Sequence, residues 1–495
     1  METKRASWSG QAAFILAAAA SAIGLGNLWR FPYLAAQYGG GTFILVYLCL
    51  TVTLGFTLML TEIAIGRKTR SAPLVAYAKL NRKWGFLGIL GTLVPMLITP
   101  YYCVLGGWVL FYLKTYAVMA FTGAAPLGEA AVNSHAFFNA FISASFAPFG
   151  YATLFLLGSA GVIVLGVKNG IEKSNLVMMP VLFLMAISIS IYVICYSWGS
   201  GGLGYYLLPN LDSVSVDGHF SFTMLGKTFL GAMGQMFYSL SLAMGIMITY
   251  GSYMRSEDSI ERSVRRIEFF DTLIAIVAGL MIIPVVYLFA VKTGVTPELL
   301  AKCGGDKVAA TQEAVHAAMN TGPGLMFITL PKVFATLGRA GAWIGLMFFL
   351  LVTFAAATSA ISLFEACVSS VCDSLKLTRR RATVVTAALL LFLAAFSAFG
   401  YGPLANVRPF GMQFLDFFDF ITNSAIMPFL AAATCVFVGY VLTPQVVVDE
   451  VECGGRTMKA KKLYTAMVKY FAPVLVIAIL VSEICRALGI GGWKI

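Results

Sequence analysis

The sequence predicts an all-α polytopic membrane protein with about eleven transmembrane helices. Of its 495 residues, 59% are hydrophobic and 11% are charged, and the mean hydropathy is +0.85. Soluble domains carry about 25% charged residues, so this chain is too apolar to fold in water. Apolar runs of about 20 residues, the length needed to cross a bilayer, recur along the chain. Basic residues collect in every second loop between these runs.

The predicted spans cover, in chain order, residues 11–36, 42–66, 88–122, 152–167, 175–197, 226–252, 268–292, 335–372, 382–399, 412–442 and 468–490. The first is interrupted at Gly24 and Gly26, and the sixth between Ser239 and Gly245. Every backbone polar group inside a bilayer needs a partner within the protein, so an interrupted span must lie against protein or a water-filled cavity. Its free amides and carbonyls can then bind a ligand.

The break in the first span predicts two neighbouring sites. A helix that restarts after Gly26 presents unpaired N–H groups and the positive end of its dipole, which suit a carboxylate. The carbonyls of the preceding helix suit a small cation. Paired broken helices in corresponding positions are typical of secondary transporters that bind their substrate near the middle of the membrane.

The two broken spans open two successive sets of five helices. Because five is odd, the second set must run with inverted topology. We therefore assign residues 1–200 to a first repeat with helices 1–5, residues 201–442 to a second, inverted repeat with helices 6–10, and residues 443–495 to a cytoplasmic loop and helix 11. The segment 303–332, which contains Gly322-Pro-Gly, is expected to form a short helical hairpin.

The net charge of +12 does not indicate nucleic-acid binding, because the basic residues follow the positive-inside rule. They are Lys4 and Arg5; Arg67, Lys68 and Arg70; Lys168 and Lys173; Arg255, Arg262, Arg265 and Arg266; Lys376, Arg379, Arg380 and Arg381; and Arg456, Lys459, Lys461 and Lys462. This pattern places the N-terminus in the cytoplasm and, with an odd number of helices, the C-terminus outside. The first span is too long for a cleavable signal peptide.

The sequence offers no enzymatic centre. The nine cysteines are scattered singly without CxxC or metal-like spacing, and there is no nucleotide-binding loop and no nucleophile with its base. His135, His219 and His316 fall in predicted outer loops, and these loops contain no Asn-x-Ser/Thr acceptor. We expect no organic cofactor and a prokaryotic inner or cytoplasmic membrane.

Five motifs occur in order along the chain. They are Gly24-Leu-Gly-Asn-Leu-Trp-Arg-Phe-Pro, Tyr38-Gly-Gly-Gly-Thr-Phe, Glu62-Ile-Ala-Ile-Gly-Arg, Gly170-Ile-Glu-Lys and Phe327-Ile-Thr-Leu-Pro. Together with the broken helices they closely resemble the neurotransmitter:sodium symporter family, particularly its bacterial amino-acid transporters, over roughly the first ten helices. The resemblance implies the leucine-transporter fold and sodium-coupled symport of a small neutral amino acid by alternating access.

The resemblance also implies two sodium sites. The first would use the Ala22 carbonyl, Asn27, the Ser239 hydroxyl and carbonyl, Asp271 and the substrate carboxylate. The second would use the carbonyls of Ala20, Ile23 and Ala355 with the hydroxyls of Thr358 and Ser359. Carbonyls and hydroxyls suit sodium because they supply several oxygens with little fixed charge. Hydroxyls in membrane helices also commonly bond to the preceding turn, so that alternative remains for Thr358 and Ser359.

The substrate site is likewise implied by the family. The substrate carboxylate would meet the Leu25 and Gly26 amides and the Tyr102 hydroxyl. The amino group would meet the carbonyls of Ala22, Tyr238 and Ser239 and the Ser241 hydroxyl, and the walls would be Ile98, Tyr238, Met244, Ser359, Ser362 and Leu363. Monoamine-transporting relatives have an aspartate at the position of Gly24, so glycine here implies that the substrate brings its own carboxylate.

Charged residues within spans need a function because burying one costs about 2.5–3.5 kcal/mol. By resemblance, Arg30 and Asp419 form an outer gate, and Arg5 and Asp373 form an inner gate packed by Trp8 and Tyr253. An ordinary solvated surface pair is the alternative for Arg5 and Asp373. Glu62 is expected to hold backbone amides of a broken helix, whereas the sequence assigns no role to Glu365.

Three features depart from the family pattern. Asp271 stands where many relatives have asparagine, which adds a negative charge to the first sodium site. Ala243 replaces the first glycine of the usual Gly-x-Gly in the second broken helix. The sequence ends after helix eleven, whereas many relatives have a twelfth.

Two alternatives to amino-acid symport remain at this point. The first is sodium-coupled uptake of an organic or keto acid that lacks the amine, since the expected amine contacts are largely backbone groups. The second is a channel, which would need a continuous polar pore. Charge pairs on both sides of one central site argue against a channel.

Overall fold

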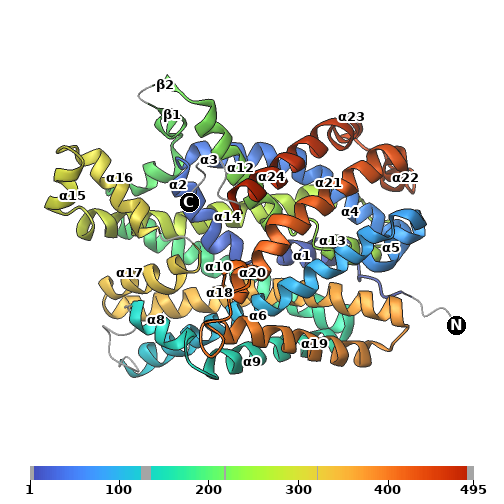
Figure 1. Cartoon of the computed structure of the whole chain (residues 1–495), viewed down its shortest axis with the longest axis horizontal. Helices are drawn as coiled ribbons and strands as arrows, with labels where there is room; N and C mark the ends of the chain where they lie inside the picture. The colour runs from blue at the N-terminus through green and yellow to red at the C-terminus, as the bar shows by residue number, and fades with distance from the viewer. Residues whose placement is uncertain (1–4, 124–134, 217–218, 320–321, 488–495) are drawn as a thin grey trace.

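The computed structural model describes residues 5–123, 135–216, 219–319 and 322–487. Its long helices run side by side along the longest axis of the molecule (Figure 1). We call the end of the bundle at which the first helix begins the inner end and the opposite end the outer end, after the orientation that the basic loops predict. The fold is all-α apart from one short hairpin of strands β1 (Ser215–Val216) and β2 (His219–Phe220), in which Val216 pairs with His219.

The helices of the first half correspond to the first five predicted spans. In order these are α1 (Gln11–Ala22), η1 (Gly26–Arg30) and α2 (Phe31–Gln37); α3 (Gly41–Leu50), η2 (Thr51–Gly55) and α4 (Phe56–Thr69); α6 (Phe86–Thr122); α9 (Ala147–Val164); and η4 (Val167–Glu172) with α10 (Lys173–Tyr196). Shorter helices lie between them: α5 (Pro73–Leu80), η3 (Arg82–Trp84), α8 (His135–Ile142), α11 (Gly202–Leu207) and η5 (Leu211–Val214).

The second half supplies the remaining six spans. These are α12 (Phe222–Ser239) with α13 (Ile246–Ser252); α14 (Ile260–Thr293); α18 (Arg339–Leu375); α19 (Arg379–Phe399); α20 (Phe414–Asp419), η8 (Phe420–Ile426), α21 (Met427–Val436) and η9 (Phe437–Val441); and α23 (Lys461–Ala466), η10 (Met467–Phe471) and α24 (Ala472–Ala487). Between them lie α15 (Pro297–Lys302), α16 (Lys307–Ala318), η6 (Leu325–Thr329), α17 (Leu330–Thr336), η7 (Pro409–Gly411) and α22 (Gln445–Glu452).

The predicted membrane architecture is confirmed. Within the described residues, nine helices are long and apolar enough to cross a bilayer, and α1 with the helix Gly26–Gln37, bent by 53° at the break, makes a tenth. The pair α12 and α13 occupies the sixth predicted span and is interrupted between Ser239 and Ile246. The predicted helical hairpin in 303–332 is formed by α16 and by η6 with α17. The largest shifts concern the fifth and seventh spans, which begin at Val167 and Ile260 rather than at residues 175 and 268.

The break in the sixth span is made by left-handed backbone. Ser241 has φ 53°, Ala243 has φ 57° and Gly245 has φ 70°. A left-handed conformation costs a residue with a side chain about 1–2 kcal/mol, which only glycine avoids. The Glu62 carboxylate accepts a hydrogen bond of 2.7 Å from the Ala243 amide and so holds this segment open. The predicted role of Glu62 is confirmed.

Helices α4 and α13 pack backbone against backbone. A Cβ on Gly66 would lie 1.9 Å from the Ile248 carbonyl oxygen, and one on Gly251 would lie 2.5 Å from the Ile63 carbonyl oxygen. Only glycine permits this approach. Farther along, α22 packs on α4, and the buried Arg67 side chain forms an ion pair of 2.7 Å with Glu450. These contacts join α13, α4 and α22 into one packed group at the inner end.

Candidate functional site

The two broken helices face each other across a small cavity of about 20 Å³ near the middle of the bundle. Its lining includes Ser21, Ala22, Gly24, Leu25, Gly26, Asn27, Ile98, Tyr102, Tyr238, Ser241, Met244, Ile246, Ser359 and Leu363. The predicted substrate residues therefore lie together, with two exceptions. Ser239 and Ser362 do not line the cavity, and Ser21 and Ile246, which the sequence did not single out, do.

Two glycines allow side chains to reach the backbone of the first break. A Cβ on Gly26 would lie 2.4 Å from a ring carbon of Tyr238. A Cβ on Gly24 would lie 2.7 Å from the Ser359 hydroxyl and 3.1 Å from the Tyr102 hydroxyl. A side chain at position 24 therefore requires the Ser359 hydroxyl to move.

Hydroxyl groups converge on the broken backbone from three other helices. The Leu25 amide donates to the Tyr102 hydroxyl at 3.3 Å. The Ser21 carbonyl accepts hydrogen bonds from Ser241 at 3.3 Å and from Ser359 at 3.0 Å. A backbone carbonyl such as that of Ser21 is independent of the side chain, so the sequence could not single out this residue and the structure was needed to place it at the cavity.

A buried polar cluster lies beside the cavity and contains three predicted sodium ligands. Asn27 donates to Asp271 at 2.8 Å and to Ser239 at 3.0 Å. The Ser239 hydroxyl donates to the same carboxylate at 2.8 Å, and the Tyr47 hydroxyl donates to it at 3.0 Å. Tyr47 was missed, because an aromatic residue in an apolar run looks like packing. The cluster explains why Ser239 does not face the cavity.

The Asp271 carboxylate is fully buried and has only neutral donors around it. Among the ion pairs of the described residues, none includes Asp271. Burying an uncompensated carboxylate is costly, so buried charges in proteins are normally paired or bound to a cation. This cluster is therefore chemically suited to a small cation.

The residues predicted for a second sodium site are all buried, but their hydroxyls have partners within the protein. Thr358 donates to the carbonyls of Ala355 at 3.0 Å and Phe354 at 3.1 Å, which is the back-bonding alternative. Ser359 bonds instead across to α1, through Ser21. The Ala20, Ile23 and Ala355 side chains have no exposed surface.

Ser362 was predicted in the cavity wall, but it does not line the cavity in the present arrangement. Its hydroxyl donates to the Thr358 carbonyl at 2.8 Å and accepts from Tyr250 at 3.1 Å. Ser362 lies one helical turn beyond Thr358 on α18, and this turn faces α13 rather than the cavity.

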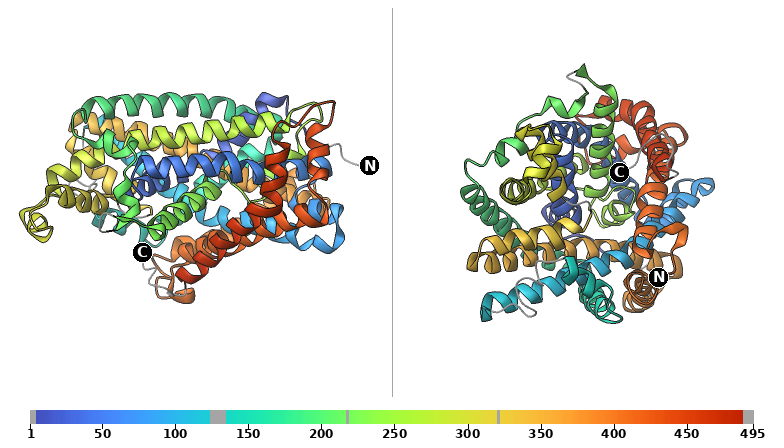
Figure 2. Two further views of the ribbon diagram at one scale, coloured as in Figure 1. Left: turned by 90° about the horizontal axis from the view of Figure 1, so that it is seen from above. Right: turned by 60° about the vertical axis from the view of Figure 1, so that its left-hand side comes forward.

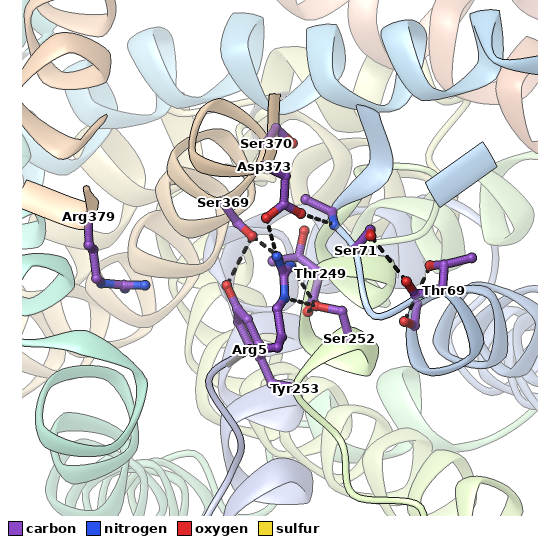
Figure 3. A network of polar contacts seen from close by, with 12 residues as sticks. Arg5, Thr69, Ser71, Thr249, Ser252, Tyr253, Ser369, Ser370, Asp373 and Arg379 are labelled. Carbon is purple, nitrogen blue, oxygen red and sulfur yellow. Dashed lines mark hydrogen bonds and ion pairs between the residues drawn. The ribbon is translucent and has the colours of Figure 1, made fainter. Parts of the chain in front are cut away.

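The residues predicted for an inner gate lie together at the inner end of the bundle (Figure 3). Arg5 forms an ion pair with Asp373 and donates to Ser252 and Ser369, at 2.8 and 2.9 Å. The second carboxylate oxygen of Asp373 accepts from the Ala72 amide at 2.7 Å. Both charged side chains are about four-fifths buried, at 20% and 19% exposure, so the solvated surface pair is not what the structure shows.

Aromatic rings close the same region. The Arg5 guanidinium lies 4.9 Å from the centre of the Tyr253 ring. Trp8 is fully buried, packs edge-on against Tyr253 at 6.0 Å and donates to the Tyr250 carbonyl at 3.0 Å. The aromatic residues predicted for the inner gate therefore lie in it.

Glu365, which the sequence left without a role, belongs to this inner network. Its fully buried carboxylate accepts from the Tyr253 hydroxyl at 2.7 Å and forms an ion pair of 2.5 Å with Arg379. Arg379 also donates to the Ile163 carbonyl at 2.7 Å. The partner comes from the start of the next helix, and no spacing rule in the sequence connects the two.

The predicted outer charges lie near the cavity but do not form an ion pair with each other within the described structure. Arg30 lies over the Tyr238 ring at 5.6 Å. Asp419 accepts from Tyr101 at 2.9 Å and from Asn423 at 2.5 Å. The outer end is thus lined with the expected residues, held by neutral partners.

Comparison with known proteins gives a consistent result. The sequence profile of the sodium:neurotransmitter symporter family matches residues 5–135 and 147–491. An uncharacterized sodium-dependent transporter of Bacillus subtilis is 30% identical over 488 residues, covering 98% of each chain. One from Methanocaldococcus jannaschii is 28% identical over 86% of this chain and 80% of its own.

A solved structure gives the same answer for the fold. The crystal structure of MhsT in complex with L-phenylalanine matches with a TM-score of 0.80 and 29% identity, over 97% of this chain and all of that one. The chain therefore belongs to the sodium:neurotransmitter symporter family and is a sodium-dependent, multi-pass membrane transporter rather than an enzyme.

Proposed function

We propose that the protein carries a small neutral amino acid, aliphatic or aromatic, together with sodium by alternating access. The observation that carries this proposal is the uncompensated Asp271 carboxylate beside the cavity. Asn27 both lines the cavity and donates to Asp271. An ion held by this cluster would therefore adjoin a substrate carboxylate placed at the Leu25 and Gly26 amides. The complex of MhsT with an amino acid supports this substrate class.

Two sodium sites are part of the proposal. The first comprises Ala22, Asn27, Ser239 and Asp271, and the second comprises Ala20, Ile23, Ala355, Thr358 and Ser359. In the second, the Thr358 hydroxyl can keep its hydrogen bond to the preceding turn while its oxygen lone pairs face an ion, since a hydroxyl is both donor and acceptor. We further propose the inverted repeats 1–200 and 201–442 and a cytoplasmic N-terminus as the framework of the transport cycle.

Sodium and substrate should bind with positive coupling. A shared carboxylate would ligate the first ion, and linkage requires each ligand to strengthen the other equally. Substrate affinity measured in detergent should fall at least fivefold when potassium or choline replaces sodium at equal ionic strength. Unchanged affinity would refute a shared site.

Tyr102 provides a sharper test of the substrate pose. Tyr102→Phe removes a hydroxyl that faces the broken backbone and should weaken substrate binding by about 1.5–3 kcal/mol, the range for a hydrogen bond to a charged group. Isothermal titration in sodium measures the effect. Tyr112→Phe is the matched control, because its hydroxyl is buried against the Phe327 carbonyl away from the cavity. Equal affinity of Tyr102→Phe and wild type would leave Tyr102 as a packing residue.

A keto or organic acid that lacks the amine is the second candidate. One observation favours it: Ser239, whose carbonyl is one of the expected amine contacts, does not line the cavity. A thermal-shift comparison of matched amino and keto acids, each with and without sodium, separates the two. Stabilisation by the keto acid that equals or exceeds that by the amino acid would favour this candidate.

A further inference from the structure

The last two spans meet near the inner end of the bundle through two π-helical turns, η9 (Phe437–Val441) and η10 (Met467–Phe471). These spans, coloured orange and red, lie at the edge of the bundle (Figure 2). A Cβ on Gly439 would lie 3.5 Å from the Cα of Lys469 and 3.7 Å from its Cγ. The Tyr440 hydroxyl donates to the Lys469 carbonyl at 2.6 Å. The stem of the Lys469 side chain therefore lies against η9.

Lys469 is a charged residue inside an apolar span, and its ammonium group is unpaired in the described part of the chain. Among the ion pairs of the described residues, none includes Lys469, whereas Lys461 at the start of the same span pairs with Glu452 at 3.8 Å. A charge within a span is costly and normally has a functional partner. A lysine near the end of a span keeps its stem on apolar surface and extends its ammonium group toward the lipid headgroups.

The surface beside Lys469 is apolar and aromatic. Tyr470, Val474 and Ile477 are 62%, 66% and 47% exposed and recur at the spacing of one helix face. Across the contact with η9, Tyr440 is 59% exposed. In a bilayer an apolar face of this kind contacts lipid tails, and tyrosine is favoured at the level where tails meet headgroups. An amphiphile whose head meets Lys469 can therefore lay its tail along this face.

Lys462 adds a second positive charge close to the same face of the last span. It lies seven residues before Lys469, about 10 Å along the helix axis. Its side chain is exposed, and no ion pair among the described residues includes it. Two lysines without an acidic partner favour an anionic ligand. Basic sites between spans on the cytoplasmic side of a membrane bind the phosphate of lipid headgroups.

We propose that Gly439, Tyr440, Lys469 and Tyr470 form a binding site for an anionic phospholipid of the inner leaflet, in the orientation that the basic loops predict. The Lys469 ammonium pairs with the lipid phosphate, Lys462 attracts the headgroup from the membrane surface, and one acyl chain lies along the face that begins at Tyr470. A bound lipid contacts both spans and so stabilises the packing of α24 on α21. The site shares no residue with the lining of the cavity between the broken helices.

Phosphatidylglycerol is the probe for a direct test on the purified full-length protein in a neutral detergent. A thermal-shift titration should give a saturable increase in Tm with phosphatidylglycerol and a smaller one with phosphatidylcholine, which has no net charge. Lys469→Met keeps a stem of similar length but removes the charge, and it should weaken phosphatidylglycerol binding about fivefold. Lys469→Arg keeps the charge and should bind within about twofold of wild type.

Lys376→Met is the matched control, because Lys376 is also an exposed lysine at the inner end without an ion pair in the described structure. It should leave phosphatidylglycerol binding unchanged. Glycerol phosphate, which carries the phosphate without acyl chains, should not raise Tm at the same concentration.

A second variant keeps the test decisive if Lys469→Met does not fold. Lys462→Met should weaken phosphatidylglycerol binding about threefold, because it removes the more distant of the two charges. The proposal is overturned if the two phospholipids shift Tm equally, or if the folded Lys469 and Lys462 variants bind phosphatidylglycerol like wild type. It is also overturned if Lys376→Met loses as much affinity as Lys469→Met, or if glycerol phosphate reproduces the shift.

Discussion

The two ends of the bundle differ in how their charged side chains are held. At the inner end, Arg5 and Asp373 form an ion pair, and Glu365 and Arg379 form another. At the outer end, Arg30 lies over Tyr238, and Asp419 has only neutral donors. We propose that the ion pairs close the inner end, and that Arg30 and Asp419, which do not pair with each other in the described structure, pair when the outer end closes. Opening inward would thus break ion pairs, and closing outward would form one.

The largest effect should follow from breaking the inner pair. Asp373→Ala leaves Arg5 buried without its carboxylate and frees the Ala72 amide. An unsatisfied buried group costs about 1–3 kcal/mol, more when it is charged, and every 1.4 kcal/mol changes an equilibrium about tenfold. We expect transport in proteoliposomes to fall at least tenfold. The rate at which a thiol reagent added from the inner side labels cysteines should increase, because the inner end opens more readily.

A control on the same side of the bundle isolates the effect of the network. Arg265→Ala removes a half-exposed arginine that pairs with Glu261 within one helix. Pairs between residues four apart on one helix contribute about 0.3–0.5 kcal/mol, so transport should stay within twofold. Equal losses in Asp373→Ala and Arg265→Ala would mean that the inner ion pair is not a gate.

The outer charges should give a smaller effect, confined to transport. Arg30→Gln prevents an ion pair with Asp419 from forming when the outer end closes, and a gate acts on a conformational step rather than on ligand contact. We expect about a fivefold loss of transport with equilibrium substrate affinity changed less than twofold. A variant that transports normally would show that the two charges never pair during the cycle.

Asp271 lies between the two ends and should determine the anion requirement. Because its carboxylate supplies a fixed negative charge beside the first ion, transport should proceed without chloride. Uptake in gluconate should therefore match uptake in chloride to within about twofold, as a charge already in place needs no mobile counterion. Asp271→Asn should make uptake dependent on chloride. If the variant keeps both the chloride independence and the pH dependence of the wild type, the extra charge has no role in coupling.

The smallest effect should come from protonation of His316, in the last turn of α16. Burial lowers the pKa of this imidazole below its usual value, since desolvation disfavours the charged form, although a hydrogen bond to the Ala36 carbonyl opposes the shift. The neutral form therefore stabilises the docking of α16 on α2. That contribution is present above a pH of about 6.5 and is lost as the pH falls through the lowered pKa.

Hydrogen exchange of α16 measures this contribution. Exchange should accelerate about twofold to threefold when the pH falls from about 7.5 to about 5.5, after correction for the intrinsic pH dependence of exchange, because protonation of the imidazole disfavours this docking. His316→Gln, which keeps a donor but does not titrate, should remove the change. A corrected exchange rate in wild type that is independent of pH would contradict the assignment.

The helices and their breaks could be predicted because they depend on patterns that are local in sequence. Apolar run length located the spans, and Gly24, Gly26 and Gly245 located the breaks. Asn27, Ser239 and Asp271 were brought together by resemblance to the family, and their hydrogen bonds agree with that grouping. Their functional roles remain a proposal.

What the sequence missed depends on how one helix is rotated against another. Tyr47 reaches Asp271 from α3, and Arg379 reaches Glu365 across a turn, yet neither residue type is unusual where it stands. Ser362, by contrast, was expected in the cavity wall, but its turn of α18 faces Tyr250 instead of the cavity. Helix rotation is set by packing over the whole bundle, so a motif read along one helix does not specify it.

The close packing of α13 on α4 suggests where a fluorescent label would report on the transport cycle. The unwound segment before α13 is tied to α4 by Glu62, and α4 is tied in turn to α22 by Arg67 and Glu450. We expect a rearrangement of the unwound segment to move α22 through these contacts. Cys453, exposed directly after α22, is a native attachment point for a fluorophore there, and its emission would follow turnover without any label near the site.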